Sequence, residues 1–395
     1  MRFSADLHQE LVTARAQTDQ LFDLLSPEAH YDRPIVERNR IIFYLGHLEA
    51  FDWNHLARRC LDLPSFHPGF DTLFERGIDP EPGQLPSDQP KDWPSLPEVK
   101  SYNNRVREKL DEVWEETPRD RRQMVIEHRQ MHAETFAYML HNLNPEKKRR
   151  PAEPPVPEAS PVRQEMITIP AGYATLGRDR DHEFGWDNEF QEQRIHVPEF
   201  RISKFKVANR EYLDFVRAGG PLPHFWQADG EVWLYRGMFG LEPLPLDAPV
   251  YVNREQAAAY AAWKGLALPS EAQYHRAAFG TPSGEADSLP HGGNRDFRFW
   301  DPVAVNATPE DMSPLGVAQT GGNGWEWTDT VFAPFAGFEA TSYYPGYSAD
   351  FFDGKHYVVK GASSRTADQL TRRSFRNWYR SEYPYTYTGF RVAGN

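Results

Sequence analysis

Five prolines fall within the twelve residues 150–161, near the middle of the chain. Proline restricts φ and lacks a backbone donor, so a run of this kind is stiff and extended and interrupts any helix or sheet. A chain of 395 residues is also too long for one ordinary hydrophobic core. We therefore expect two domains, residues 1–150 and 163–395, joined by a linker over residues 151–162.

The part before the linker has the periodicity of helices. Apolar residues recur at helical spacing over about Leu7–Leu25, Arg38–Leu61, Leu96–Thr117 and Arg119–Leu143. A proline-rich segment, Asp79–Pro97, interrupts this pattern and is expected to be an extended loop. Four long helices with short or irregular connections indicate an antiparallel four-helix bundle.

The part after the linker has a different texture, in which short strands alternate with loops rich in glycine, proline and aromatic residues. Strands are predicted at Met166–Ile169, Tyr357–Lys360 and Gly389–Ala393. Helices are predicted at Asn209–Ala218, Arg254–Gly265 and Ser270–Ala278, the last with Ser270 as its cap. The whole chain is therefore expected to be of the α+β class, with the function of the second domain carried by its loops.

Charge and cysteine usage exclude several classes of protein. The formal net charge is −13 and the one short basic run, Lys147–Arg150, lies at the domain boundary, so nucleic-acid binding is not expected. The single cysteine, Cys60, allows no intramolecular disulfide and fits a reducing compartment. The first residues, Met1–Asp6, lack the apolar core of a signal peptide, and no apolar run is long enough to span a membrane. We expect a soluble cytoplasmic protein that acts on small molecules, without a nucleic-acid or membrane partner.

Three histidines of the helical domain form a candidate metal site. His128 and His132 are four residues apart and project from one face of the last helix, as two imidazole ligands of one ion must. His47 lies in the second helix between apolar residues, where a charged imidazole would be unfavourable. Facing helices of a bundle commonly build such sites. Three imidazoles suit zinc, copper or iron, and the spacing alone does not choose among them.

Other polar residues near this pattern are expected to have lesser roles. Glu134 lies about 200° around an ideal helix from His132, so we expect it to make a hydrogen bond away from the metal face. His55, His67 and His141 are expected to be surface residues.

Both halves of the chain resemble known families. The pattern His128-xxx-His132-x-Glu134, with an upstream histidine in a helical domain, resembles the DinB-like half of the ergothioneine-biosynthesis sulfoxide synthases. The second half resembles the formylglycine-generating, sulfatase-modifying domain, which implies a loop-rich C-type-lectin-like fold. The motifs that carry this second resemblance are residues 268–274, 322–328, 360–363 and 389–393. Trp325 and Trp327, within the second of these motifs, are expected to be core residues.

The resemblance implies Fe(II) bound by His47, His128 and His132, with the substrate pocket completed by the second domain. Members of this family join the sulfur of a thiol donor to imidazole C2 of N-alpha-trimethylhistidine (hercynine), with O₂ as the oxidant. In one branch a tyrosine of the second domain donates a proton or hydrogen. Tyr344-Pro345-Gly346-Tyr347 repeats the spacing of that branch's two active-site tyrosines, so Tyr344 and Tyr347 are the catalytic candidates, with Tyr343 as the alternative.

The substrate-binding residues are likewise implied by the resemblance. Asn377 and Trp378 occupy the position of an Asn-Trp pair that holds hercynine. Aromatic rings are also expected around its quaternary ammonium, because such cations favour ring faces. The residues that offer rings are Trp378, Tyr379, Tyr383, Tyr385 and Tyr387. Met131 replaces a family glutamine, and the adjacent Gln130 is the candidate in its place.

The donor site departs from the branch that uses gamma-glutamylcysteine. Tyr379 and Tyr383 stand where that branch has an aspartate and an arginine, and Asp79–Pro97 contains no arginine. Fixed countercharges are needed to select a charged dipeptide. Tyrosine hydroxyls favour a neutral polyhydroxylated donor, which resembles the selenoneine synthase branch with its selenosugar; cysteine and gamma-glutamylcysteine remain the alternatives.

Three other functions have different requirements. A formylglycine-generating enzyme needs a cysteine pair in its C-terminal region, and residues 61–395 contain no cysteine. A non-catalytic or thiol-transferring DinB-like metal-binding protein would consume no oxygen. An enzyme of the ovothiol type would attach sulfur at C5 of the imidazole instead of C2.

Overall fold

The computed structural model describes residues 6–78, 85–180 and 184–394. The predictions for Met1–Asp6 and for the start of the Asp79–Pro97 loop therefore fall mainly on residues 1–5 and 79–84, outside the described residues. The chain divides into two compact units, Met1–Ala152 and Glu153–Asn395. Within the described ranges, no helix combines the length and the apolar character needed to cross a membrane.

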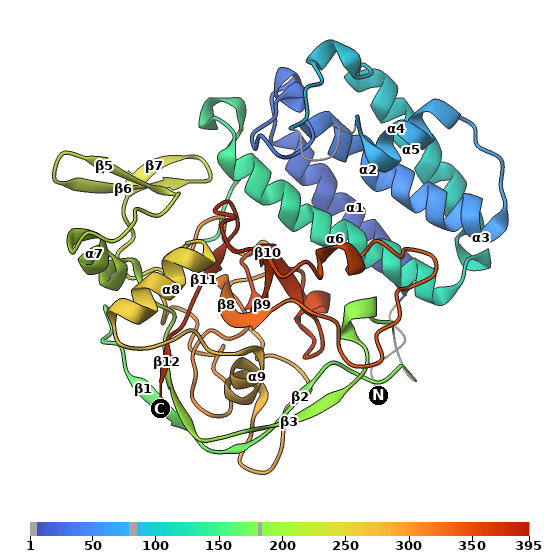
Figure 1. The fold of residues 1–395 in the computed structure, drawn as a ribbon. Coiled ribbons are helices and arrows are strands. Elements are labelled where there is room, and N and C mark those ends of the chain that lie inside the picture. Colours follow the sequence, from blue (N-terminus) through green and yellow to red (C-terminus); the bar gives the residue numbers. More distant parts are fainter. Residues whose placement is uncertain (1–5, 79–84, 181–183, 395) are drawn as a thin grey trace. The chain divides into compact units, whose positions relative to one another are not determined.

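The first unit is helical, as predicted (Figure 1). Its helices are α1 (Leu7–Asp23), α2 (Ile41–Asp52), α3 (Arg59–Leu61), α4 (Pro68–Arg76), α5 (Leu96–Val113) and α6 (Arg119–Asn142). Local capping explains where the long helices begin. The Asp6 side chain accepts hydrogen bonds from the first turn of α1, and Ser95 and Glu98 form a capping box at the start of α5. Pro118 directly precedes α6.

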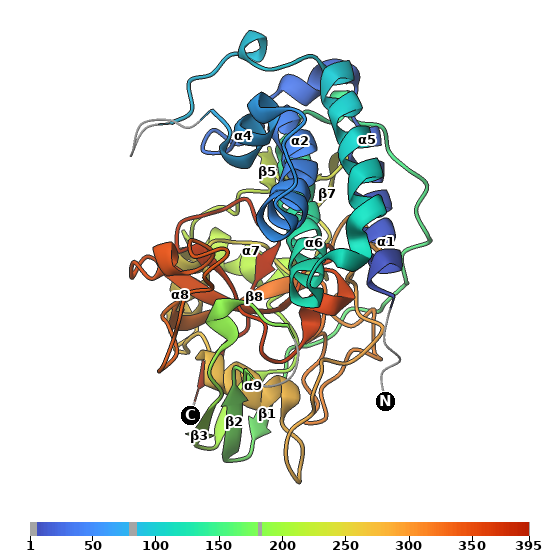
Figure 2. The same ribbon diagram turned by 90° about the vertical axis from the view of Figure 1, so that its right-hand side faces the viewer.

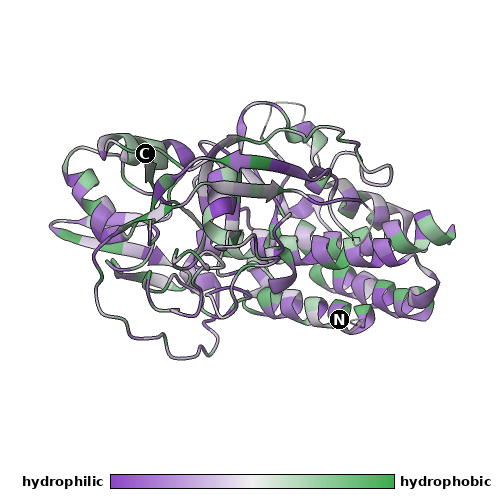
Figure 3. Cartoon of the chain, turned by 90° about the horizontal axis from the view of Figure 1, so that it is seen from below, coloured by the Kyte–Doolittle hydropathy of each residue, from purple (hydrophilic) through white to green (hydrophobic). Residues whose placement is uncertain are grey.

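Helix α2 is the centre of this unit, since all twelve of its residues are buried. The longer helices around it show alternating hydrophobic and hydrophilic stretches (Figure 3), which is the pattern of helices that bury one face. The prediction of one helix over Arg38–Leu61 was wrong in detail. The helix begins at Ile41 and passes through a π-helical turn, Trp53–Arg58, before α3.

Helix α4 was not predicted. It is only nine residues long and its first two residues are Pro68 and Gly69, so it shows too few turns for a periodic signal. It ends at Gly77, whose φ of +81° favours glycine.

Over its described residues, the second unit combines small sheets with three helices and long loops, which confirms the predicted α+β class. The sheets have the strand orders β1-β4-β12, β2-β3, β5-β6-β7 and β10-β9-β8-β11. The strands are β1 (Met166–Ile169), β2 (Gly172–Leu176), β3 (Gln193–Val197), β4 (Phe200–Ser203), β5 (Trp226–Asp229), β6 (Val232–Gly237), β7 (Gly240–Pro243), β8 (Gly324–Val331), β9 (His356–Ala362), β10 (Asn377–Arg380), β11 (Thr388–Gly389) and β12 (Ala393–Gly394). The helices are α7 (Asn209–Arg217), α8 (Arg254–Trp263) and α9 (Glu271–Phe279).

The three predicted helices of this unit are confirmed within two residues at each end, and Ser270 caps α9 as expected. The predicted strand Gly389–Ala393 was wrong. Gly389 ends β11, Ala393 begins β12, and the residues between them cross from one sheet to another.

A buried apolar cluster lies among β1–β4, β12 and α9. Its members are Ile169, Ala174, Val197, Phe200, Ile202, Ala277, Val317 and Ala393. Trp325 and Trp327 are also buried, which confirms their prediction as core residues. Between them Glu326 points inward, and its buried carboxylate accepts hydrogen bonds from Lys206 and Arg391 at 2.5 and 2.8 Å. Strands β8, β9 and β10 of this unit carry or flank the loops that hold the candidate residues discussed below.

Candidate metal centre and aromatic site

The structure brings the three predicted histidines together. His47 comes from α2, and His128 and His132 come from successive turns of α6. One ring nitrogen from each lies within 4.8 Å of the others. His47 and His128 are buried, and His132 is partly exposed. Because the donors come from two helices that pack side by side, their spacing depends on the register between α2 and α6.

Burial holds all three imidazoles in the neutral form. It lowers the pKa of His47 to about 4, and it lowers the pKa values of His128 and His132 well below their usual range. Charge repulsion from His132 and His47 also lowers the pKa of His128, and repulsion from His47 lowers the pKa of His132. A neutral imidazole keeps a lone pair for a metal.

The orientation of His47 is determined by a backbone carbonyl. Its Nδ1 lies 2.7 Å from the carbonyl oxygen of Phe74 in α4. A carbonyl only accepts hydrogen bonds, so Nδ1 must carry the proton and Nε2 keeps the lone pair. This is the arrangement in which histidine ligands are usually held in metal sites.

Aromatic rings of α2 pack against the same imidazoles. The ring of Phe51 stacks on His128 with 3.5 Å between centroids and 9° between planes. Phe43 stacks on His47 at 4.8 Å. Three neutral nitrogen donors in an apolar surrounding fit a divalent transition metal such as iron, zinc or copper.

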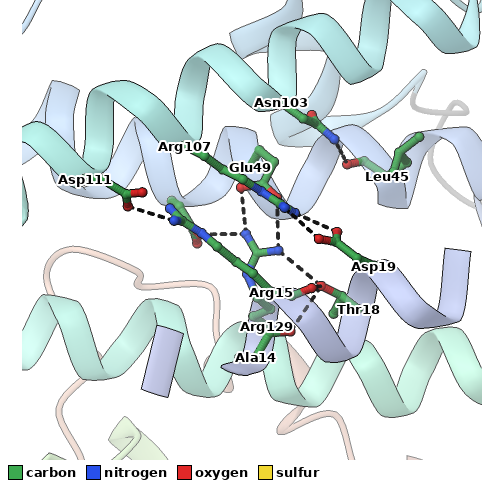
Figure 4. A network of polar contacts seen from close by, with 11 residues as sticks. Ala14, Arg15, Thr18, Asp19, Leu45, Glu49, Asn103, Arg107, Asp111 and Arg129 are labelled. Atoms are coloured by element: carbon green, nitrogen blue, oxygen red, sulfur yellow. Dashed lines mark hydrogen bonds and ion pairs between the residues drawn. The ribbon is translucent and has the colours of Figure 1, made fainter. Parts of the chain in front are cut away.

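A buried ion network lies directly behind the histidines. Arg129, next to His128, donates to Glu49 at 2.9 Å and to Asp52 at 2.7 Å, both on α2. Arg107 of α5 joins Glu49 to Asp19 of α1 (Figure 4). The four long helices are thus tied together beside the candidate metal centre.

The secondary expectations for the helical unit had mixed outcomes. The prediction that His55 and His141 are surface residues was wrong, because their side chains are 4% and 1% exposed. His67 is exposed, as expected, and its ring accepts a hydrogen bond from Phe70 N at the start of α4. Gln130 and Glu134 are buried on α6, and their roles remain predictions.

In the second unit, the predicted catalytic tyrosines lie in the loop between β8 and β9. Tyr347 stacks on Trp186 at 4.0 Å and meets the edge of Trp378 at 5.5 Å. Tyr344 lies 5.8 Å from Tyr347, measured between ring centroids. Trp378 in turn stacks on Phe332 at 4.2 Å. Trp186 was not predicted, because no local pattern connects it with residues some 160 positions later.

The remaining candidates lie on the other face of β10 or in the segment that follows this strand. Side chains alternate along a strand, so Asn377 and Tyr379 share the face opposite to Trp378. The Asn377 amide donates to the Tyr379 hydroxyl at 3.2 Å, and Tyr379 lies parallel to Tyr383 at 6.1 Å. Tyr385 meets the edge of Tyr383 at 5.0 Å. Tyr387, by contrast, is buried in the interior at 2% exposure.

Family models match both units of the chain. Residues 10–142 match the DinB superfamily, and residues 152–395 match the sulfatase-modifying factor enzyme 1-like domain. The hercynine oxygenase of Mycolicibacterium smegmatis is 32% identical, over 76% of this chain and 79% of its own length. The chain belongs to the hercynine oxygenase family. The family resemblance inferred from the motifs is therefore confirmed for both halves.

Two longer proteins are also similar to this chain over nearly its whole length. Ergothioneine biosynthesis protein 1 of Neurospora crassa is 28% identical over 94% of this chain and 55% of its own length. Its counterpart in Schizosaccharomyces pombe is 30% identical over 94% of this chain and 54% of its own length. The chain thus spans about half the length of these two relatives.

Proposed function

We propose that this protein is an O₂-dependent non-haem iron enzyme that joins a selenium or sulfur atom to imidazole C2 of hercynine. The observation that carries the proposal is the cluster of three neutral imidazoles, His47, His128 and His132, in a chain of the hercynine oxygenase family. Fe(II) held by these residues would activate triplet O₂. With a thiol or selenol donor the overall reaction balances when the S–H or Se–H bond and the C2–H bond break, one oxygen atom goes to sulfur or selenium and the other leaves in water. The electrons that reduce O₂ come from the two substrates.

Residues of the second unit are proposed to bind hercynine and to move a proton. The ring of Trp378 is proposed to offer a face to the trimethylammonium group, and the Asn377 amide is proposed to hold the carboxylate end. Tyr344 is proposed to donate a proton from its phenol oxygen, with Tyr347 as its companion. The packing of Tyr347 between Trp186 and Trp378 supports this role by restricting how the loop can move.

The proposed donor is a selenosugar. Tyr379 and Tyr383 lie parallel, and the Tyr379 hydroxyl is tied to Asn377, so this face of β10 offers rings and neutral hydroxyls. Sugar C–H groups pack well on aromatic faces, and hydroxyls pair with hydroxyls without a charge penalty. Cysteine or gamma-glutamylcysteine is the alternative donor.

The test begins with anaerobic loading of the protein with Fe(II). The loaded protein is then mixed with hercynine and one donor at a time: selenosugar, cysteine or gamma-glutamylcysteine. Oxygen uptake is measured, and the products are identified by mass spectrometry. We expect uptake and a hercynine adduct, both lost in His128→Ala and both kept in His196→Ala, whose histidine is exposed on β3. A kinetic preference for the dipeptide would overturn the selenosugar assignment, and product NMR separates C2 from C5 attachment.

A protein that binds the metal but consumes no oxygen with any donor would contradict the proposal. That result would favour a non-catalytic DinB-like metal-binding protein.

A further inference from the structure

Helix α4 approaches α2 at a position where α2 has no side chain. Figures 1 and 2 show the two helices beside one another. A Cβ built on Gly46 would lie 2.4 Å from Cδ1 and 2.5 Å from Cγ of Phe74. Carbon atoms that are not bonded do not come this close, so the observed distance between the helices requires glycine at position 46.

Close packing prevents the Phe74 ring from moving away from a methyl group at position 46. It is fully buried. Its neighbours are the rings of Phe70 at 5.3 Å, Tyr102 at 6.1 Å and Trp93 at 6.4 Å. A methyl group at position 46 would therefore displace the backbone of α4, because the interior around the ring is closely packed.

The same turn of α4 supplies the carbonyl that holds His47. Phe74 is the third residue from the end of the helix, and its carbonyl belongs to the last turn, which has no helical donor. Gly77 ends the helix, with its own N–H donating to Leu73 O at 2.7 Å. The freed Phe74 oxygen accepts from His47 Nδ1 at 2.7 Å.

We infer that Gly46 and the last turn of α4 together position His47 as a metal ligand. Because Gly46 has no side chain, α4 can pack close to α2. The Phe74 carbonyl then orients the His47 imidazole and leaves its Nε2 as the metal-binding nitrogen. The carbonyl also lies at the negative end of the α4 dipole, which favours the partial positive charge of a metal-bound imidazole. Gly46, Phe74 and Gly77 are positioning residues and touch no substrate. The inference rests on the proposed metal centre.

The test is a double-variant cycle read by Co(II) binding to the full chain. Loss of a hydrogen-bonded partner behind a histidine ligand typically weakens metal binding about 10- to 100-fold. We expect Gly46→Ala to weaken Co(II) binding by at least about 10-fold on that basis, although alanine is the better helix former. In a Phe74→Ala background, which keeps the carbonyl and removes the ring, the same Gly46→Ala change should alter the affinity by less than about 3-fold, well below the loss expected for a missing partner.

A second readout reports on the hydrogen bond itself. In the Co(II)-loaded protein, the His47 Nδ1 proton should give a paramagnetically shifted, slowly exchanging NMR signal. We expect that signal in wild type and in Phe74→Ala, and expect its loss in Gly46→Ala. Circular dichroism establishes that each variant is folded.

Gly77→Ala is the independent variant if Gly46→Ala does not fold. Alanine at position 77 would strain the last turn of α4, because the backbone φ there is +81° and the added Cβ would lie 2.9 Å from Asn39. This variant adds no bulk at Gly46. We expect Gly77→Ala to weaken Co(II) binding in the same way as Gly46→Ala. Unchanged affinity and an unchanged proton signal in a folded Gly46→Ala or Gly77→Ala protein would overturn the inference. Failure of the proposed function would instead appear in wild type, as absent metal binding or absent oxygen uptake.

Discussion

At the scale of single residues, the Tyr344 hydroxyl is the group proposed to donate a proton during the reaction. Tyr344→Phe keeps the ring beside Tyr347 and removes only that hydroxyl. We expect iron content and binding of both substrates to be retained, with a lower turnover or a changed product distribution, measured by oxygen uptake and mass spectrometry. Tyr173→Phe, at a side chain that is 46% exposed, is the matched control. Unchanged kinetics and products would remove Tyr344 from the site.

His55 shows how a single buried residue makes stability depend on pH. Burial and the neighbouring Arg59, which donates to its Nε2, lower the pKa of His55 to about 3. The unfolded chain, with an ordinary histidine pKa, therefore binds more protons between pH 6.5 and 3. Stability falls as the pH falls through this window.

The His55→Gln variant tests this dependence. Glutamine keeps an acceptor for Arg59 but does not titrate. In metal-free protein, the slope of the unfolding free energy between pH 6 and 5 should decrease by about 1.4 kcal/mol per pH unit, measured by urea denaturation. His67→Gln, at an exposed histidine, is the control. A slope equal to that of wild type would show that His55 is already accessible to protons.

At the scale of elements, the register between α2 and α6 depends on Arg129. Its fully buried guanidinium pairs with Glu49 (Figure 4) and with Asp52. Removing it leaves two buried carboxylates with one charge partner fewer. Arg129→Met should destabilise the helical unit by about 3–5 kcal/mol, seen in urea denaturation followed by circular dichroism. Lys109→Met, which breaks an exposed pair with Glu112, should cost at most about 1 kcal/mol. Equal effects of the two changes would contradict this account of the network.

Elements also differ in how far the sequence predicted them. The long helices and the capped helix α9 follow from the spacing of apolar residues and from local capping, which operate within a few residues. Helix α4 and the π-helical turn Trp53–Arg58 were missed, because both are short. The prediction of a strand at Gly389–Ala393 was wrong because the chain passes from one sheet to another within this segment. The consecutive residues Phe390 and Arg391 are both fully buried there, so the alternation of buried and exposed residues along a strand could not reveal the crossing.

At the scale of the whole molecule, the proposed metal ligands and the candidate Gln130 lie in the first unit, and the other predicted substrate residues lie in the second. All three histidines and the Phe74 carbonyl lie within Met1–Ala152. We therefore expect a fragment of residues 1–152 to bind Co(II) with affinity within about 10-fold of the full chain, since its ligands and their hydrogen-bond partner are all present. The fragment 153–395 should show no stoichiometric binding. Titration followed by the Co(II) absorption bands tests this, and a folded 1–152 fragment that binds no metal would contradict it.

The sequence by itself predicted two domains of different composition, and it determined most of the long helices of the first domain and the placement of His128 and His132 on one helix face. Each of these rests on spacing within one segment, and helical geometry converts that spacing directly into a shared face. His47 was also identified, from its apolar neighbours. Only the tertiary structure decided that α4 presents a carbonyl to His47, that His55 and His141 are buried, and that Trp186 packs on Tyr347. These contacts depend on which distant segments pack together, and that is determined by the sum of many weak interactions over the whole core.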